Sequence, residues 1–183
     1  MISGNSKIKQ MTLIGLMTAV LCILAPLSLT LPISPVPVTM GNMAVCFVVV
    51  VLGMKRGCIS TLIYLLLGLA GLPVFSGFTG GIGKLLGPTG GYLLGYLFLA
   101  LLFGFFIERF NNHPVSNALG AIAGMLLLYL FGTLWLSFQL DLGFISALWA
   151  GVIPYVPLDI IKIILATLLG TKLRKRLVQA ELI

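Results

Sequence analysis

Six apolar segments, separated by short polar, Pro-rich or Gly-rich links, constrain the fold of this chain more than any other feature. A helix needs about 20 mostly apolar residues to cross the hydrocarbon core of a bilayer. Backbone groups in lipid must bond within their own segment, so such segments fold as helices. The sequence therefore predicts an all-α membrane protein of six transmembrane helices. The expected spans are about Ile8–Leu29, Thr39–Met54, Gly57–Leu72, Leu86–Ile107, Ser116–Phe138 and Ser146–Lys172.

Composition supports the same class. Hydrophobic residues make up 60% of the 183 residues and charged residues 8%, whereas soluble domains are about 45–50% apolar. So few charges could not cover a soluble fold of this composition. Residues 1–183 are therefore expected to form a single integral membrane domain. The net charge of +7 does not indicate nucleic-acid binding, because most basic residues lie between or beside the apolar segments, as membrane orientation requires.

The basic residues also predict an orientation, since cytoplasmic links carry an excess of Lys and Arg. With the N-terminus inside, only Lys84 falls outside and only Lys162 falls within a span. Both termini are thus expected in the cytoplasm of a prokaryotic cell, with the chain crossing the plasma membrane several times. The Pro-rich link 31–40 and the Gly-rich link 72–83 then lie on the external face. Irregular backbone at membrane depth is tolerated where it lines a cavity, so these links are expected to roof an outward-facing pocket.

A charged pair lies inside the sixth apolar segment. Asp159 and Lys162 are three residues apart, a spacing that places them on one face of a helix. A charge at the centre of a bilayer costs about 3 kcal/mol on insertion scales, so the two side chains must face each other, a cavity or a ligand. Ligand binding, a structural tether between helices, and a proton relay remain open, although the spans offer no second acid for a relay.

Small residues recur at four-residue spacing in three spans, a pattern that permits close approach of helices. Gly91 and Gly95 in the fourth span and Gly120 and Gly124 in the fifth predict packing within the chain. In the first span, Gly15 and Ala19 suit a face that docks another membrane protein.

Motifs for catalysis or metal binding are missing from the sequence. The three cysteines have no metal-ligand spacing, and the single histidine, His113, has no neighbouring nucleophile. Gly81-Ile-Gly83-Lys-Leu-Leu-Gly87 is spaced too widely for a nucleotide fingerprint and follows a helical span. An enzyme, a metal site and a bound cofactor are therefore not expected. A channel is disfavoured too, because the spans hold almost no polar residues that could line a pore.

Two longer motifs resemble one known family. Leu72-Pro-Val-Phe-Ser-Gly-Phe-Thr-Gly-Gly-Ile-Gly, with Leu86-Gly-Pro-Thr-Gly-Gly-Tyr, resembles the signature of the BioY family, as do Pro35-Val-Pro-Val-Thr39 and Ile153-Pro-Tyr-Val-Pro-Leu-Asp159-Ile-Ile-Lys162. Members are biotin-specific substrate-binding (S) components of energy-coupling-factor (ECF) vitamin transporters. The resemblance implies partners: biotin, a transmembrane coupling (T) protein, which would dock on Gly15 and Ala19, and two cytoplasmic ATPase subunits. Gly15 departs from the family's usual alanine, and Gly41-Asn42 replaces its frequent Gln-Thr pair.

The resemblance also implies a binding site. Asp159 would accept a hydrogen bond from a ureido N–H of biotin, and Lys162 would pair with a carbonyl or the carboxylate. Which polar end meets which residue is left open. The links 31–40 and 72–83 would close over the ligand. Two other functions remain open: an S component for another vitamin or a biotin precursor, and a structural membrane protein. The other expected contacts are Thr79, through its hydroxyl and backbone, and the apolar walls Phe75, Phe78, Tyr92 and Tyr155.

Overall fold

The protein is described by a computed structural model that covers residues 2–30, 36–110, 112–180 and 182. Helices make up most of it, with one short antiparallel strand pair in which Ser28 faces Thr39 and Leu29 faces Val38. The elements, in chain order, are α1 (Ile2–Leu24), β1 (Ser28–Leu29), β2 (Val38–Thr39), α2 (Gly41–Leu52), α3 (Met54–Leu69), α4 (Ile82–Leu86), α5 (Gly90–Arg109), α6 (Pro114–Gln139), α7 (Phe144–Gly151) and α8 (Val156–Gln179).

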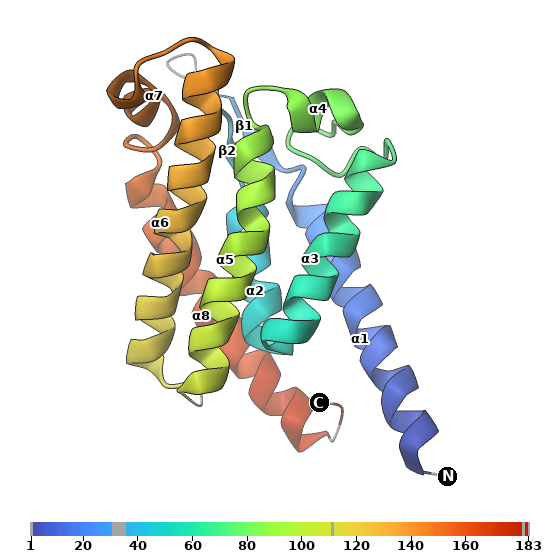
Figure 1. The fold of residues 1–183 in the computed structure, drawn as a ribbon. Coiled ribbons are helices and arrows are strands. Elements are labelled where there is room, and N and C mark those ends of the chain that lie inside the picture. The colour runs from blue at the N-terminus through green and yellow to red at the C-terminus, as the bar shows by residue number, and fades with distance from the viewer. Residues whose placement is uncertain (1, 31–35, 111, 181, 183) are drawn as a thin grey trace.

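The long helices form a bundle with two unlike ends (Figure 1). The strand pair, the short helix α4 and the short helix α7 gather at the upper end. Both chain termini lie at the lower end. The described parts of the irregular links predicted to share one face of the membrane thus share one end of the bundle.

Among the described residues, three helices, α1, α5 and α6, are long and apolar enough to cross a membrane, and α7 with α8 makes a fourth crossing if the bent pair counts as one. The coarse prediction of a helical membrane protein is confirmed. The six predicted spans are not all continuous helices of membrane length, because α2 has 12 residues and α3 has 16. The predicted sixth span is broken, with a bend of 53° between α7 and α8, next to Pro154 and Pro157, which interrupt the backbone hydrogen-bond ladder.

Two other boundaries differ from the sequence prediction. The first helix ends at Leu24, ahead of Pro26, and the chain then enters β1 instead of continuing to Leu29. The fourth span begins at Gly90, because Gly87 and Pro88 separate it from the short helix α4. Pro26 acts at the first place and Gly87 with Pro88 at the second, since Pro cannot donate to the backbone hydrogen-bond ladder and Gly has a low helix propensity.

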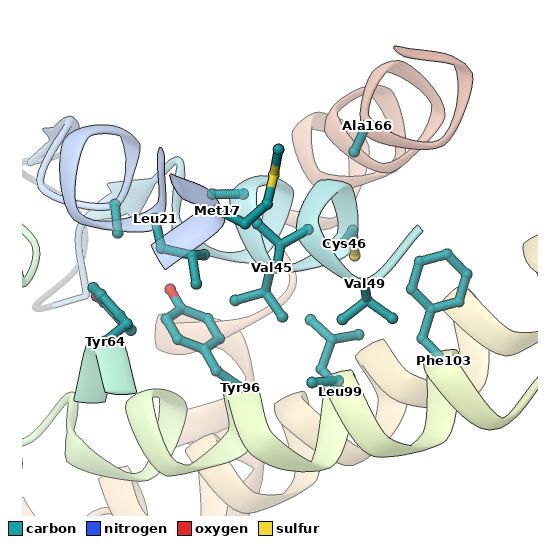
Figure 2. Packing of buried hydrophobic residues seen from close by; sticks show 14 of the residues in the cluster. Met17, Leu21, Val45, Cys46, Val49, Tyr64, Tyr96, Leu99, Phe103 and Ala166 are labelled. Carbon is teal, nitrogen blue, oxygen red and sulfur yellow. The ribbon is translucent and has the colours of Figure 1, made fainter. Parts of the chain in front are cut away.

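Helix α2 lies at the centre of the bundle. All of its residues except Met43 and Phe47 are buried, and α2 packs against α1, α3, α5 and α8. Figure 2 shows Val45 and Val49 of α2 in the same cluster as Leu21 of α1 and Leu99 of α5. A helix that is apolar on all sides, as α2 is, suits a position surrounded by other helices.

Glycines bring α5 and α6 together. A Cβ placed on Gly95 would lie 3.3 Å from the Cα of Leu128, and one on Gly120 would lie 2.5 Å from the Cβ of Phe106. A Cβ on Gly91 would likewise contact Trp135 of α6, and one on Gly124 would contact Leu99 of α5. The prediction that these glycines pack within the chain is confirmed.

Gly120→Ala is expected to lower the free energy of unfolding by about 1–3 kcal/mol, the usual cost of overpacking a filled core. The added methyl would collide with the Cβ of Phe106, which cannot move without its helix. Thermal or denaturant unfolding in detergent would measure the change. Gly83→Ala is the control, because open space surrounds Gly83. Equal stability of the two variants would contradict tight packing of α5 on α6.

Candidate functional site

A cavity lies at the end of the bundle that carries the strand pair. It encloses about 640 Å³ of empty space, the solvent at its mouth included. The walls come from α2, α3, α5, α6, α7 and α8 and from the links between the helices. The lining residues are Ala25, Val36, Pro37, Val38, Thr39, Asn42, Tyr64, Ser76, Thr89, Tyr92, Leu93, Tyr96, Leu128, Tyr129, Gly151, Tyr155, Asp159 and Lys162.

The buried pair Asp159 and Lys162 contributes the charges of this cavity. The Lys162 Nζ lies 2.9 Å from the Asp159 Oδ1 and donates to the Thr39 carbonyl at 2.8 Å. The Tyr129 hydroxyl donates to the second carboxylate oxygen, Asp159 Oδ2, at 2.7 Å. The two charged residues are only 6% and 8% exposed. Asp159 also lies in the first turn of α8, where the helix dipole favours a negative charge.

This network leaves capacity for a ligand. An ammonium carries three donors and a carboxylate has about four acceptor sites. Lys162 uses two donors, toward Asp159 and Thr39, and Asp159 accepts one side-chain bond at each oxygen. A polar group in the cavity could therefore bond to either residue without first breaking the pair.

Three tyrosines fix the irregular backbone around the cavity. The Tyr155 hydroxyl donates to the Val36 carbonyl at 2.6 Å, and the Tyr92 hydroxyl donates to the Gly151 carbonyl at 3.2 Å. The Tyr96 hydroxyl lies 3.1 Å from the Thr39 Oγ1. Buried tyrosines commonly combine an apolar ring with such a bonded hydroxyl. The rings thus wall the cavity while the hydroxyls hold its links in place.

Tyr64 differs from the other tyrosines of the cavity. Its side chain is 1% exposed, and its hydroxyl has no hydrogen-bond partner in the part of the chain that the structure describes. An unsatisfied buried hydroxyl costs about 1–3 kcal/mol. Tyr64 lines the cavity near Tyr96 (Figure 2), so a bound ligand or a water could supply the missing partner.

Four of the seven residues predicted to bind a ligand lie together. Asp159, Lys162, Tyr92 and Tyr155 all line the cavity. They come from helices α5 and α8 and from the break before α8. The three-residue spacing of Asp159 and Lys162 predicts that they share one face of a helix, and in the fold their side chains are in contact.

The other three predicted residues, all in the Gly-rich link, do not line the cavity. Phe75 is fully buried in the core, where its ring meets Tyr64 edge-on at 5.7 Å between ring centres. Phe78 is 64% exposed. The Thr79 hydroxyl donates to the Ser76 carbonyl. The reason is a tight turn in which Phe75 and Thr79 bond to each other through their backbones, so Ser76 is the residue of this turn that reaches the cavity.

Residues 31–35 of the predicted Pro-rich link lie outside the described residues. The rest of that link, from Val36 to Thr39, lines the cavity. It is held by Tyr155 at Val36 and by Lys162 at Thr39.

Sequence reasoning missed Tyr129, Thr39 and Asn42 as residues of the cavity. Tyr129 carried a usable signal, because a hydroxyl within an apolar span needs a partner. Thr39 acts through its backbone carbonyl, which no side-chain pattern reveals. Asn42 stands where the family often has another residue, so the resemblance implies no role for it, yet it is buried at the start of α2 and lines the cavity.

The predicted docking stripe lies on the outer surface of α1. Gly15 and Ala19 are both exposed, and a Cβ on Gly15 would meet nothing within 4 Å. The stripe is therefore open to lipid or to another protein.

A bundle of apolar helices with a charged cavity at one end defines an integral membrane protein with a candidate ligand site. The comparisons with known proteins agree with this class and also identify the family. The BioY family model matches residues 2–179, and the chain belongs to the BioY family.

Curated relatives and a crystal structure cover almost the whole chain. The biotin transporter BioY2 of Lactococcus lactis subsp. cremoris is 40% identical, over 94% of each chain. The biotin transporter BioY of Thermotoga maritima is 36% identical, over 91% of this chain and 96% of the relative. A crystal structure of the S-component for biotin from an ECF-type ABC transporter superposes with a TM-score of 0.87, at 34% identity and 93% coverage of each chain. These relatives are transport proteins. This chain belongs to the same family and is a transport protein, not an enzyme.

Tyr129→Phe is expected to lower the free energy of unfolding of the ligand-free protein by about 1.5–3 kcal/mol, because a hydrogen bond to a charged group is lost. Unfolding in detergent would measure it. Tyr64→Phe is the matched control, since the Tyr64 hydroxyl has no partner among the described residues, and removing it is expected to be neutral or stabilising. Equal losses in the two variants would argue against the bond between Tyr129 and Asp159.

Proposed function

We propose that the chain is the substrate-binding subunit of an ECF-type importer and that it captures biotin in the cavity around Asp159 and Lys162. The observation that carries the proposal is the buried charged pair at the wall of a cavity between the helices, in a chain whose relatives are biotin transporters. The subunit forms a single membrane domain over residues 1–183, binds no cofactor or metal, and hydrolyses nothing itself.

The chemistry of the cavity suits biotin. Its ureido ring carries two N–H donors and a carbonyl, and its apolar chain ends in a carboxylate. Asp159 accepts from a ureido N–H and Lys162 donates to the carbonyl or the carboxylate, both as strong charge-assisted bonds. Tyr92 and Tyr155 provide walls for the thioether ring and the chain. An analogue without the ureido group would leave buried polar groups unpaired, which supports selectivity.

Closure of the Gly-rich link completes the proposed site. Phe78 is largely exposed and Thr79 bonds within its own turn, so they reach a ligand only if the link 72–83 moves. We propose that this link and the link 31–40 close over bound biotin. Phe75, packed against Tyr64, anchors one side of the moving turn and sits behind the ligand.

The proposed orientation has six membrane segments, an outward-facing cavity and cytoplasmic termini in the prokaryotic plasma membrane. Two observations support it. Both ends of the chain lie at the end of the bundle away from the strand pair (Figure 1), and the basic residues at the ends of α1 and α8 mark a cytoplasmic side.

Delivery of the ligand requires partners in this proposal. A transmembrane coupling protein docks on the exposed stripe of Gly15 and Ala19 on α1, and two cytoplasmic ATPase subunits supply energy. A small-residue stripe lets a partner helix approach closely.

Asp159→Asn is expected to abolish protection of the purified protein by biotin against thermal unfolding, because the charged acceptor is lost. Lys162→Ala is expected to weaken the protection. Asp141→Asn makes the same chemical change at an exposed position outside the cavity, and we expect it to bind like the unmodified protein.

Other outcomes of this titration would separate the alternatives. If Asp159→Asn unfolds readily with or without biotin, the pair is structural. If the folded, unmodified protein gains no stability from biotin but does from a precursor or another vitamin, the substrate assignment is wrong while the subunit class stands.

Ala19→Leu is expected to leave biotin binding unchanged and to reduce copurification of the coupling protein, because the larger side chain keeps a partner helix away. Ala118→Leu, at an exposed position on α6, is the matched control. Coexpression with the coupling module followed by affinity purification would measure the yield of complex. Equal yields would place the docking face elsewhere.

A further inference from the structure

A second hollow lies at the opposite end of the bundle from the cavity around Asp159 and Lys162. It encloses about 670 Å³, open solvent included, between the end of α2, the start of α3 and the ends of α5 and α8. This is the end that carries both termini (Figure 1). The residues that line it are Leu52, Lys55, Arg56, Glu108, Arg174 and Val178.

Two side chains of the hollow hold the turn between α2 and α3. The Arg174 Nη1 donates to the Val50 carbonyl at 3.0 Å, and the Glu108 Oε1 accepts from the Met54 backbone N–H at 2.9 Å. The turn itself passes through Gly53, at φ 84°. The hollow is thus built from four helices whose relative positions are fixed by bonds to backbone.

The charges around the hollow are unbalanced. Lys55, Arg56 and Arg174 face one carboxylate, Glu108. Within the described ranges, none of the three cations forms an ion pair, and Glu108 is bonded to backbone. Like charges gathered in one concave site attract an anion. Guanidinium groups in particular match the oxygens of a phosphate.

We propose that this hollow binds the phosphate of an anionic phospholipid headgroup from the leaflet on the side of the termini. A free phosphate ion has the same anionic chemistry, but Leu52 and Val178 favour a lipid, because they add apolar surface beside the cations. The position of the hollow at the end of the bundle also supports a lipid ligand, since basic pockets between helices at the cytoplasmic interface bind lipid headgroups.

The ordinary explanation for basic residues at this end is membrane orientation alone. If membrane orientation were their only role, removing the cations that line the hollow and removing the cations beside it would have the same effect on lipid binding. The chain offers both kinds: Lys55 and Arg56 line the hollow, whereas Lys175 and Arg176 on α8 do not. Lys55 and Arg56 also leave the backbone bonds of Arg174 and Glu108 untouched.

Native mass spectrometry of the full chain in neutral detergent, titrated with phosphatidylglycerol or phosphatidylcholine, tests the proposal. We expect one phosphatidylglycerol to bind in preference to phosphatidylcholine, and Lys55→Gln with Arg56→Gln to weaken this binding about tenfold or more, since each cation near a lipid surface contributes about 1 kcal/mol. Lys175→Gln with Arg176→Gln, which removes the same charge, is expected to retain the binding. Added salt should weaken it in the unmodified protein.

Three results would overturn the proposal. One is the absence of a preference for phosphatidylglycerol in the unmodified protein. The second is an equal loss of binding in both double variants, which would indicate general charge attraction. The third is equal protection against unfolding by inorganic phosphate and by phosphatidylglycerol, which would make the hollow a site for a soluble anion. Unfolding midpoints in lipid-free detergent would show whether each variant is folded.

Discussion

The cavity end of the molecule depends on one buried ion pair. A buried charge is strongly destabilising when its partner is missing, so Asp159 and Lys162 require each other and their further partners. Lys162 reaches the Thr39 carbonyl and Asp159 is reached by the Tyr129 hydroxyl. One network thus joins α8 to the strand pair and to α6. The residues that suit a ligand are the same ones that hold the irregular end of the bundle together.

The rest of the bundle is built differently. Glycines such as Gly95 and Gly120 let α5 and α6 approach closely, and the central helix α2 is buried on nearly all sides. Such contacts use no polar groups and produce a close-packed frame. The frame then holds Tyr92 from α5 and Asp159 from α8 in the cavity wall, and the links between helices supply further lining residues such as Val36 and Ser76.

Features that depend on local pattern could be predicted from the sequence. The membrane class follows from apolar segments, the contact of Asp159 with Lys162 from their spacing on one helix, and the packing of Gly120 from its small-residue repeat. Features that depend on distant residues could not. The inward position of Ser76 and the outward position of Phe78 result from a turn closed by backbone bonds, and the Thr39 carbonyl meets a lysine more than a hundred residues away.

The shortness of α2 has a consequence for how the protein enters the membrane. Its 12 residues give a rod of about 18 Å, well below the ~30 Å of a bilayer core. With its surface covered by α1, α3, α5 and α8, α2 gains little from lipid by itself. On this geometry α2 enters the membrane with its neighbours, as a hairpin with α3 across the turn at Gly53, and its final environment forms only when α8, which comes much later in the chain, has been inserted.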